Sequence, residues 1–271
     1  MTRHVLRFAT SSYAPHTRQV PHTHDELQVS VILRGAVRER VGTDVEEAGA
    51  LSVVVKDPGV AHADEFGAGA AVVARLAVPG TVLADLVDAG RGDTSWRWMH
   101  HAAAAASFMH LVRRGVRGEA AFAADDPDVA DLLSALTARR APAAGGDVPL
   151  WLREAVERID AEWTPGTTVR DVADAAGVHP VYLARCVRRW HGVGVADLLR
   201  EVRRRRAAAV VAGDAGSVSR AAHAAGYADE PHLCRDFASA YGVTPGRYRR
   251  LAAACAQRAS RPGALHPPRQ R

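Results

Sequence analysis

The feature that most constrains the fold of this 271-residue chain is an internal repeat in its C-terminal half. Residues 169–177 (VRDVADAAG) match residues 218–226 (VSRAAHAAG) at an offset of 49, and beyond the matched glycines the offset becomes 50. Each copy predicts a short helix, a turn at Gly177 or Gly226, and a longer second helix that ends at another glycine. The sequence therefore predicts an all-α region over residues 150–255.

A short helix, a glycine turn and a longer helix are typical of a helix-turn-helix, whose second helix enters the major groove of DNA. Two ordinary helix hairpins are the alternative interpretation. Apolar residues spaced four apart mark one face of each second helix as buried, so the opposite face is the candidate DNA-reading surface. The predicted DNA-binding residues are His179, Val181, Ala184, Arg185 and Arg188 in the first copy, and Glu230, Pro231, Cys234 and Arg235 in the second.

Charge is distributed unevenly along the chain. Residues 1–149 have a net charge of −3, whereas residues 150–271 have a net charge of +8. This asymmetry predicts that only the C-terminal half meets a polyanion such as DNA, although a solvated basic surface would give the same balance. No apolar stretch is long enough for a bilayer or a signal peptide, and the three cysteines form no CxxC pair. We therefore expect a cytoplasmic protein with reduced thiols and no membrane partner.

The N-terminal region shows the alternation of β-strands. Residues Leu27–Leu33 place apolar side chains at every second position, and Gly35, Gly42 and Gly49 supply turn signals. Short, regularly spaced strands of this kind predict a small antiparallel barrel or sandwich. From about residue 81 the apolar period becomes helical.

These patterns predict an α+β multidomain protein, with a small N-terminal β-barrel, flanking helices and an all-α C-terminal domain. The predicted boundaries are a barrel at 1–80, a helical segment at 81–140, an Ala/Pro/Gly linker at 141–149, the helix-turn-helix domain at 150–255 and a disordered tail at 256–271.

The end of the second copy carries the most specific motif. It has the sequence Gly242-Val-Thr-Pro-Gly-Arg-Tyr-Arg249, and four consecutive arginines, 203–206, lie in the segment between the copies. With the repeat, these features resemble the AraC/XylS family of transcription regulators. The resemblance implies two recognition helices in successive major grooves of promoter DNA, with RNA polymerase as a protein partner. Three positions depart from the family pattern: His179-Pro180 at the start of the first recognition helix, Arg204 and Ala221.

Two histidine-containing stretches, residues 22–28 (HTHDELQ) and 49–62, resemble the half-motifs of cupin barrels. Many AraC/XylS regulators sense an effector with such a barrel. The alternation of a strand would place His22, His24 and Glu26 on one face. The predicted effector-binding residues are His22, His24, Glu26, Gln28 and His62. No cofactor is predicted: a metal at His22, His24 and His62 is less favoured, because Gln28 and Val29 stand where metal-binding cupins usually carry a fourth ligand.

The sequence thus predicts a non-enzymatic transcription regulator that is controlled by a small-molecule effector. No nucleophile–base pair or phosphate-binding loop is evident in it. Sensing-domain helices of this family commonly dimerise, so the helices of residues 81–140 form either a homodimer interface or part of the core. Trp96 and Trp98 line either the effector pocket or an interface. The alternative is a metal-dependent cupin enzyme that carries a helical regulatory appendage.

Overall fold

The computed structural model describes residues 5–82, 84, 96–137, 148–213 and 217–260. The strands are β1 (Val5–Tyr13), β2 (Arg18–His22), β3 (Leu27–Arg34), β4 (Val37–Val41), β5 (Asp44–Ala48), β6 (Val53–Lys56), β7 (His62–Phe66), β8 (Ala71–Val78), β9 (Arg97–Met99) and β10 (Ala121–Ala123). The helices are α2 (Ala102–Val116), α3 (Pro127–Thr137), α4 (Leu150–Ala161), α5 (Val169–Ala175), α6 (Pro180–His191), α7 (Val195–Ala212), α8 (Val218–Ala224), α9 (Glu230–Tyr241) and α10 (Pro245–Ala259).

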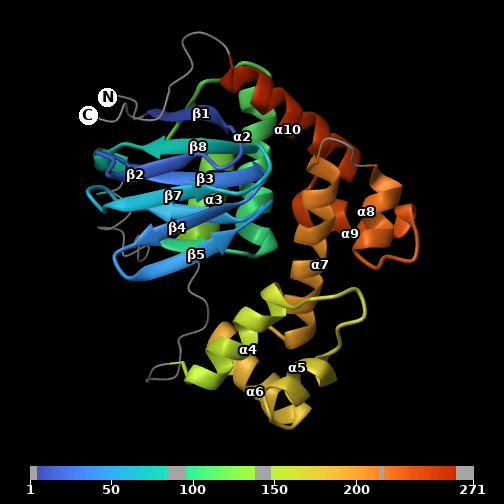
Figure 1. Cartoon of the computed structure of the whole chain (residues 1–271). Coiled ribbons are helices and arrows are strands. Elements are labelled where there is room, and N and C mark those ends of the chain that lie inside the picture. Colours follow the sequence, from blue (N-terminus) through green and yellow to red (C-terminus); the bar gives the residue numbers. More distant parts are fainter. Residues whose placement is uncertain (1–4, 83, 85–95, 138–147, 214–216, 261–271) are drawn as a thin grey trace.

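The N-terminal strands form two antiparallel sheets that face each other, which we call the barrel (Figure 1). One sheet has the order β10-β1-β8-β3-β6-β9 and the other has the order β2-β7-β4-β5. An apolar cluster that includes Ile32, Phe66 and Val73 fills one part of the space between the sheets. Alternate residues of β3, such as Val29 and Val31, point the other way into the core beneath the helices. The predicted fold class, a β-barrel followed by a helical domain, is confirmed.

The barrel does not end at residue 80, as the sequence had suggested. Strands β9 and β10 lie within the segment 81–140, where β9 pairs with β6 and β10 pairs with β1. Each has only three residues, which is too short to show a period in the sequence. Helix α2 packs closely on β1, since a Cβ at Gly115 would lie 2.2 Å from the Phe8 ring. The helices of this segment are therefore part of the N-terminal domain.

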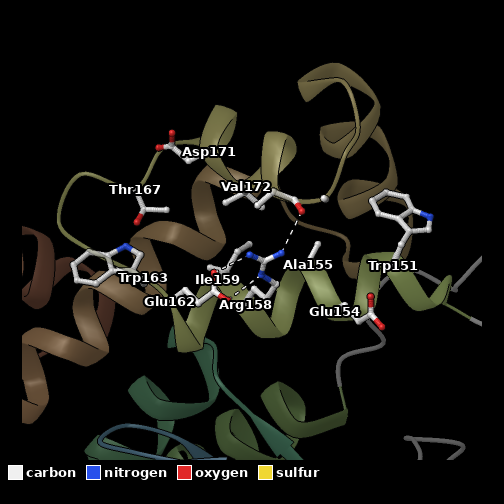
Figure 2. Close-up of a pocket in the computed structure, with 12 residues that line it drawn as sticks. Trp151, Glu154, Ala155, Arg158, Ile159, Glu162, Trp163, Thr167, Asp171 and Val172 are labelled. Atoms are coloured by element: carbon white, nitrogen blue, oxygen red, sulfur yellow. Dashed lines mark hydrogen bonds and ion pairs between the residues drawn. The ribbon is translucent and has the colours of Figure 1, made fainter.

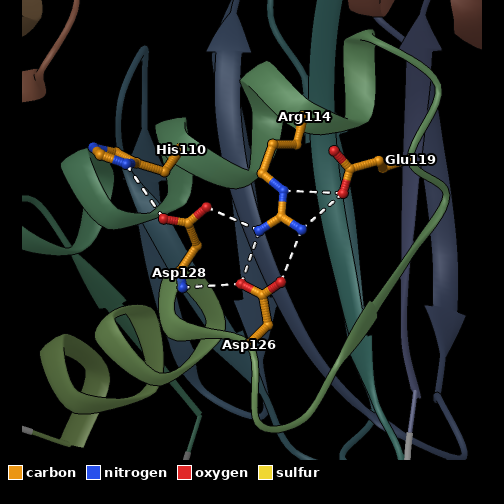
Figure 3. A network of polar contacts seen from close by, with 5 residues as sticks. All are labelled: His110, Arg114, Glu119, Asp126 and Asp128. Atoms are coloured by element: carbon orange, nitrogen blue, oxygen red, sulfur yellow. Dashed lines mark hydrogen bonds and ion pairs between the residues drawn. The ribbon is translucent and has the colours of Figure 1, made fainter.

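A charged network holds α2 to the start of α3 (Figure 3). The Arg114 guanidinium pairs with Glu119 at 2.7 Å, Asp126 at 2.8 Å and Asp128 at 3.0 Å. His110, one turn earlier on α2, has its Nδ1 atom 3.4 Å from Asp128. Because three carboxylates converge on one cation, the network orders the loop between β10 and α3.

The C-terminal helices belong to two different cores. Helices α4, α5 and α6 form a small core with the first half of α7, around Leu183 and Val187. The second half of α7 and helices α8, α9 and α10 share one continuous core with the barrel and α2, in which Phe108 and Phe237 are fully buried. Figure 1 shows α10 lying across the barrel and α2. Helices α4, α5 and α6 instead pack around the N-terminal half of α7, away from the barrel.

One hydrogen bond fixes this arrangement at a buried point. The Tyr248 hydroxyl of α10 donates to the carbonyl oxygen of Leu33 on β3 at 2.6 Å. Both residues are fully buried, so the second helix-turn-helix and the barrel cannot separate without exposing them.

The segments outside these elements differ from the expected boundaries in one respect. Helix α10 continues to Ala259, so residues 256–259 are helical rather than part of a disordered tail. Most of the predicted linker, up to residue 147, and residues 261–271 of the predicted tail lie outside the described residues. Within the described part of the chain, no helix is both long enough and apolar enough to span a membrane.

Candidate nucleic-acid interface and effector site

The first helix of each repeat begins with a side-chain cap. The Thr168 hydroxyl accepts a hydrogen bond from the Asp171 backbone N–H at 3.2 Å, and the Asp171 carboxylate accepts one from the Thr168 backbone N–H at 2.7 Å. Ser217 caps α8 in the same way by accepting from the Arg220 backbone N–H at 3.0 Å. Such caps satisfy backbone donors that have no partner within the helix. The two repeat copies therefore start alike.

The turn that follows is the same in both copies. Gly177 and Gly226 each have φ of +67°, a left-handed conformation that glycine adopts without strain. At Gly226 the space is also limited, since a Cβ there would lie 2.6 Å from the Cβ of Pro165. The matched glycines of the sequence are thus required by the backbone of the turn.

The second helices also begin and end alike. Helix α6 is capped by His179, whose Nδ1 accepts from the Val181 backbone N–H at 3.3 Å, with Pro180 at the first helical position. Helix α9 is capped by Asp229, which accepts from the His232 backbone N–H at 2.7 Å. Both helices end at a left-handed glycine. The unusual His179-Pro180 pair is therefore an N-cap followed by a proline that needs no hydrogen-bond partner.

Most of the predicted DNA-binding side chains lie on exposed faces of α6 and α9. The exposed ones are His179, Val181, Arg185 and Arg188 in the first unit, and Glu230, Pro231 and Arg235 in the second. Ala184 and Cys234 are half-buried. Sequence reasoning missed Tyr182, which is 50% exposed next to Val181 and stacks on Trp151 of α4 with ring centroids 5.7 Å apart. Its position in the first turn of α6 was the available signal.

The four arginines of α7 join the two units to each other. The Arg203 Nε donates to the Ala225 carbonyl at 2.9 Å, and Arg205 pairs with Asp160 of α4 at 2.9 Å. Arg204 pairs with Asp236 of α9 at 2.6 Å. Burial opposes ionisation of Asp236, but hydrogen bonds from Arg204 and Tyr227 outweigh it and hold its pKa below the ordinary value.

These bonds explain why Arg204 stands where the family often has an apolar residue. Its cation is matched by a carboxylate of α9, so a charged side chain is stabilised at a half-buried position.

A cleft of about 240 Å³ lies between α4 and α5 of the first unit (Figure 2). Arg158 of α4 crosses it, donating to the Ala175 carbonyl at 3.2 Å and pairing with Glu162 at 3.0 Å. Trp163, which also lines the cleft, packs against both C-terminal cores. The cleft is thus bounded by side chains that hold α4 against the short helix α5.

Three histidines meet at one end of the barrel. His22 at the end of β2 pairs across the strands with His62 at the start of β7, and their ring centroids are 4.4 Å apart. His24 completes the cluster, with one ligand atom of each residue within 4.8 Å of the others. The Nδ1 atoms of His22 and His62 lie 2.9 Å and 3.2 Å from the carbonyl oxygens of Val20 and Val60. If Nδ1 donates these bonds, each Nε2 keeps its lone pair.

Two rings of the cluster, those of His24 and His62, are held in their neutral form. Burial, reinforced by the neighbouring His62 and Lys56, lowers the pKa of His24 to about 3. Burial and then the charge of Lys56 lower the pKa of His62 to about 4. The buried Nε2 of His62 has no hydrogen-bond partner among the described residues. Neutral rings with free lone pairs are the form that binds a divalent metal or accepts a hydrogen bond from a ligand.

The other two predicted effector residues are placed differently. Glu26 was expected on the same face as His22 and His24, and this is wrong: it forms an ion pair with Arg7 and is not part of the cluster. Glu26 lies in the bend that leads into β3, where the chain has turned away from the direction of β2. Gln28 is half-buried on β3, directly opposite Lys56 of β6.

A second polar group, missed by sequence reasoning, lies deeper between the sheets. Lys56, the only lysine of the sequence, forms ion pairs with Glu39 of β4 and, at 3.5 Å, with Asp64 of β7. Glu39 is fully buried, and burial raises its pKa. The Trp96 Nε1 donates to Glu39 at 3.3 Å. Inward alternation in short strands was the signal for these residues, but charged side chains at such positions usually face solvent.

Comparison with known proteins agrees with the geometry of the repeat. Residues 172–251 match the model of a family described as a helix-turn-helix domain. This region is a helix-turn-helix domain. The match begins in α5 and ends in α10, so it contains both units and the helix that joins them. The predicted function is confirmed at this level: the protein is a DNA-binding transcription regulator.

Solved structures with detectable similarity are distant. The C-terminal domain of AraT, a response regulator from Geobacillus stearothermophilus, is 27% identical over 39% of this chain and 88% of its own, with a TM-score of 0.36. A structure of ToxT from Vibrio cholerae is 10% identical over 91% of this chain and 98% of its own, with a TM-score of 0.38. An AraC-type regulator from Chromobacterium violaceum is 24% identical over 38% and 92%, with a TM-score of 0.36. No curated protein matches the chain.

Proposed function

We propose that this AraC-type regulator changes its affinity for promoter DNA when a small-molecule effector binds in the barrel. The observation that carries the proposal is that β3 contacts both the interior of the barrel and α10. Gln28 and Ser30 of this strand lie at the polar interior, and the Leu33 carbonyl of the same strand holds Tyr248 of α10. An effector that shifts β3 therefore acts on the helix that ends the second DNA-binding unit.

On the DNA side, we propose that the exposed faces of α6 and α9 enter successive major grooves, with Arg185 and Arg235 reading bases. Several arginines would contact phosphates, so the affinity should fall steeply with salt, by roughly 10³-fold or more between 50 and 200 mM if about six phosphates are contacted. A footprint on the promoters next to its own gene tests this, and an affinity indifferent to salt would contradict it. The proposed setting is the cytoplasm, with RNA polymerase as partner and a homodimer through the 81–140 helices.

The effector half of the proposal is tested by replacing His22, His24 and His62 together with alanine. The triple variant should keep its affinity for the promoter but lose the response of a reporter gene to growth conditions that induce it. His16→Asn is the matched control, because His16 is exposed, lies away from the cluster, and has φ of +58°, which asparagine tolerates. A triple variant that responds like the parent protein would show that the cluster is not the sensing site.

A second candidate function, a metal-dependent enzyme, is favoured by the clustering of the three histidines. With a lone pair on each ring, the cluster has the donor set that suits Zn²⁺, Fe²⁺ or Cu²⁺. Metal analysis of the purified full-length protein, followed by a screen for turnover, separates the two. Metal bound with turnover supports an enzyme, whereas a protein free of metal, or one that binds metal without turnover, supports the regulator.

A further inference from the structure

A small cavity lies between the two sheets of the barrel, next to the polar group described above. Its volume is about 30 Å³, and its walls include Tyr13, Lys56, Phe66, Arg75 and Trp98. A water needs about 10–15 Å³ of such space, so the cavity has room for two or three atoms of water size. The lining thus combines aromatic rings with charged side chains.

Arg75 is the unusual member of this lining. It lies on β8, a central strand of the six-stranded sheet, and among the described residues only the Tyr13 hydroxyl accepts a hydrogen bond from it. Two other half-buried arginines are matched by carboxylates, since Arg114 has three and Arg204 has Asp236. Half-buried Arg203 and Arg97 instead donate to backbone carbonyls. A guanidinium taken out of water with a single hydroxyl as its acceptor is unfavourable, so an anion in the cavity would stabilise Arg75.

The acidic groups of the barrel interior are already engaged. Glu39 and Asp64 both pair with Lys56, and neither reaches Arg75. Neither carboxylate is therefore a partner for the Arg75 guanidinium, which has no ion pair among the described residues.

Trp98 supplies a second donor at the same cavity. Its buried Nε1 has no acceptor among the described residues, although an indole N–H usually finds one when it is buried. Trp98 is on β9, a three-residue strand at the edge of the sheet that pairs only with β6.

We propose that this cavity binds a small organic carboxylate, whose oxygens accept hydrogen bonds from the Arg75 guanidinium and the Trp98 indole N–H. This inference rests on the proposed function, because it names the chemical class of the effector. Arginine binds carboxylates through two parallel hydrogen bonds, and the aromatic wall of Tyr13 and Phe66 suits the apolar part of the acid. Formate, with three heavy atoms, matches the present volume, whereas acetate or a larger acid requires the lining to move.

The test uses the full-length protein without DNA. The indole resonances of ¹⁵N-labelled protein are followed while sodium formate or acetate is added, with formamide, acetamide and sodium chloride as matched probes at constant ionic strength. The Trp98 resonance is assigned by its loss in Trp98→Phe. We expect it to move downfield with the two carboxylates only, and the thermal midpoint to rise with them because the ligand binds only the folded state.

Variants identify the groups that bind. Arg75→Met should weaken carboxylate binding about a hundredfold or more, and Trp98→Phe about tenfold, because each removes hydrogen bonds to a charged ligand. Arg38→Met, on the exposed face of β4, is the matched control and should bind like the parent protein. If Arg75→Met does not fold, Arg75→Lys replaces it, and a weakened response in that variant supports the same conclusion.

Three results would overturn the inference. They are an equal response to acetate and acetamide, a response to chloride that matches that of acetate, and full carboxylate binding in Arg75→Met. The proposed function fails separately, in a DNA-binding assay: a protein that binds acetate but whose promoter affinity never changes would keep the anion site and lose its role as a switch.

Discussion

The two helix-turn-helix units of this protein are alike in their parts and different in what they pack against. Both have a capped first helix, a left-handed glycine and a second helix that ends at another left-handed glycine. The first unit buries its apolar face within a core of its own, whereas the second shares its core with the barrel. Local sequence thus specifies the motif, and the residues outside the motif decide whether a unit is tied to the sensing domain.

The difference has a direct consequence for how a signal can travel. An event in the barrel reaches the second unit through a continuous apolar core and the Tyr248–Leu33 hydrogen bond. It reaches the first unit only along α7, through bonds such as the Arg205–Asp160 ion pair. The second unit should therefore respond to the barrel directly, and the first unit should respond through α7.

The largest expected effect comes from Tyr248→Ala, which breaks the shared core. It should cost about 3–5 kcal/mol of unfolding free energy, as large buried aromatics do. Hydrogen exchange should show lost protection in both the barrel and α8–α10, with α4–α6 little changed. Leu183→Ala is the matched variant in the first core. It should lower the hydrogen-exchange protection of α4–α6 and leave the barrel and α8–α10 little changed. If both variants lower protection equally in all regions, the two cores unfold as one cooperative unit.

A smaller effect is expected from Arg204→Met, which leaves Asp236 half-buried without its cation. The loss should be about 3 kcal/mol, because removing one partner of a buried pair leaves an uncompensated charge. Arg200→Met on the same helix is the control: its pair with Asp197 is exposed and should contribute at most about 1 kcal/mol. Urea denaturation measures both, and equal losses would show that Arg204 does not hold the second unit.

The two recognition helices carry arginines at equivalent positions, Arg185 and Arg235. Arg185→Ala and Arg235→Ala should each cost about 1–3 kcal/mol on the specific site and relax base choice there, if both arginines read guanine. Binding to promoter variants changed one base pair at a time gives the measurement. Equal weakening on every sequence would instead indicate phosphate contacts, and an effect from Arg185 alone would mean that the second unit stays away from DNA.

The smallest effect concerns the network beside the second unit. Arg114→Met should cost about 1 kcal/mol at neutral pH, since the pair is partly exposed. A hydrogen bond from Arg114 holds the pKa of Asp126 below its ordinary value. Stability from such a carboxylate is present above the unfolded pKa and is lost as the pH falls through the folded one. The difference between variant and parent should therefore shrink below about pH 4, and a constant difference would refute the assignment.

The repeat, the caps and the glycine turns could be predicted from sequence because each depends on residues within one turn of helix. The docking of α10 on β3 could not, since Tyr248 and Leu33 are 215 residues apart and no local pattern joins them. The histidine cluster was predicted from two spaced motifs, but Glu26 was misplaced because the bend before β3 is not visible in the sequence. Arg75 was missed, because an isolated arginine in an apolar strand is ambiguous until both sheets are known.

The shared core also determines how this protein could be recombined with others. A chimeric regulator made by joining another sensing domain at residues 141–149 would leave Phe237 and Tyr248 without the barrel surface that covers them. The segment better suited to exchange is α4–α6, which packs around its own core and is joined to the rest of the protein by α7. We expect grafts of that insert to change operator choice while the sensing half, with the second unit attached, is transferred as a single block.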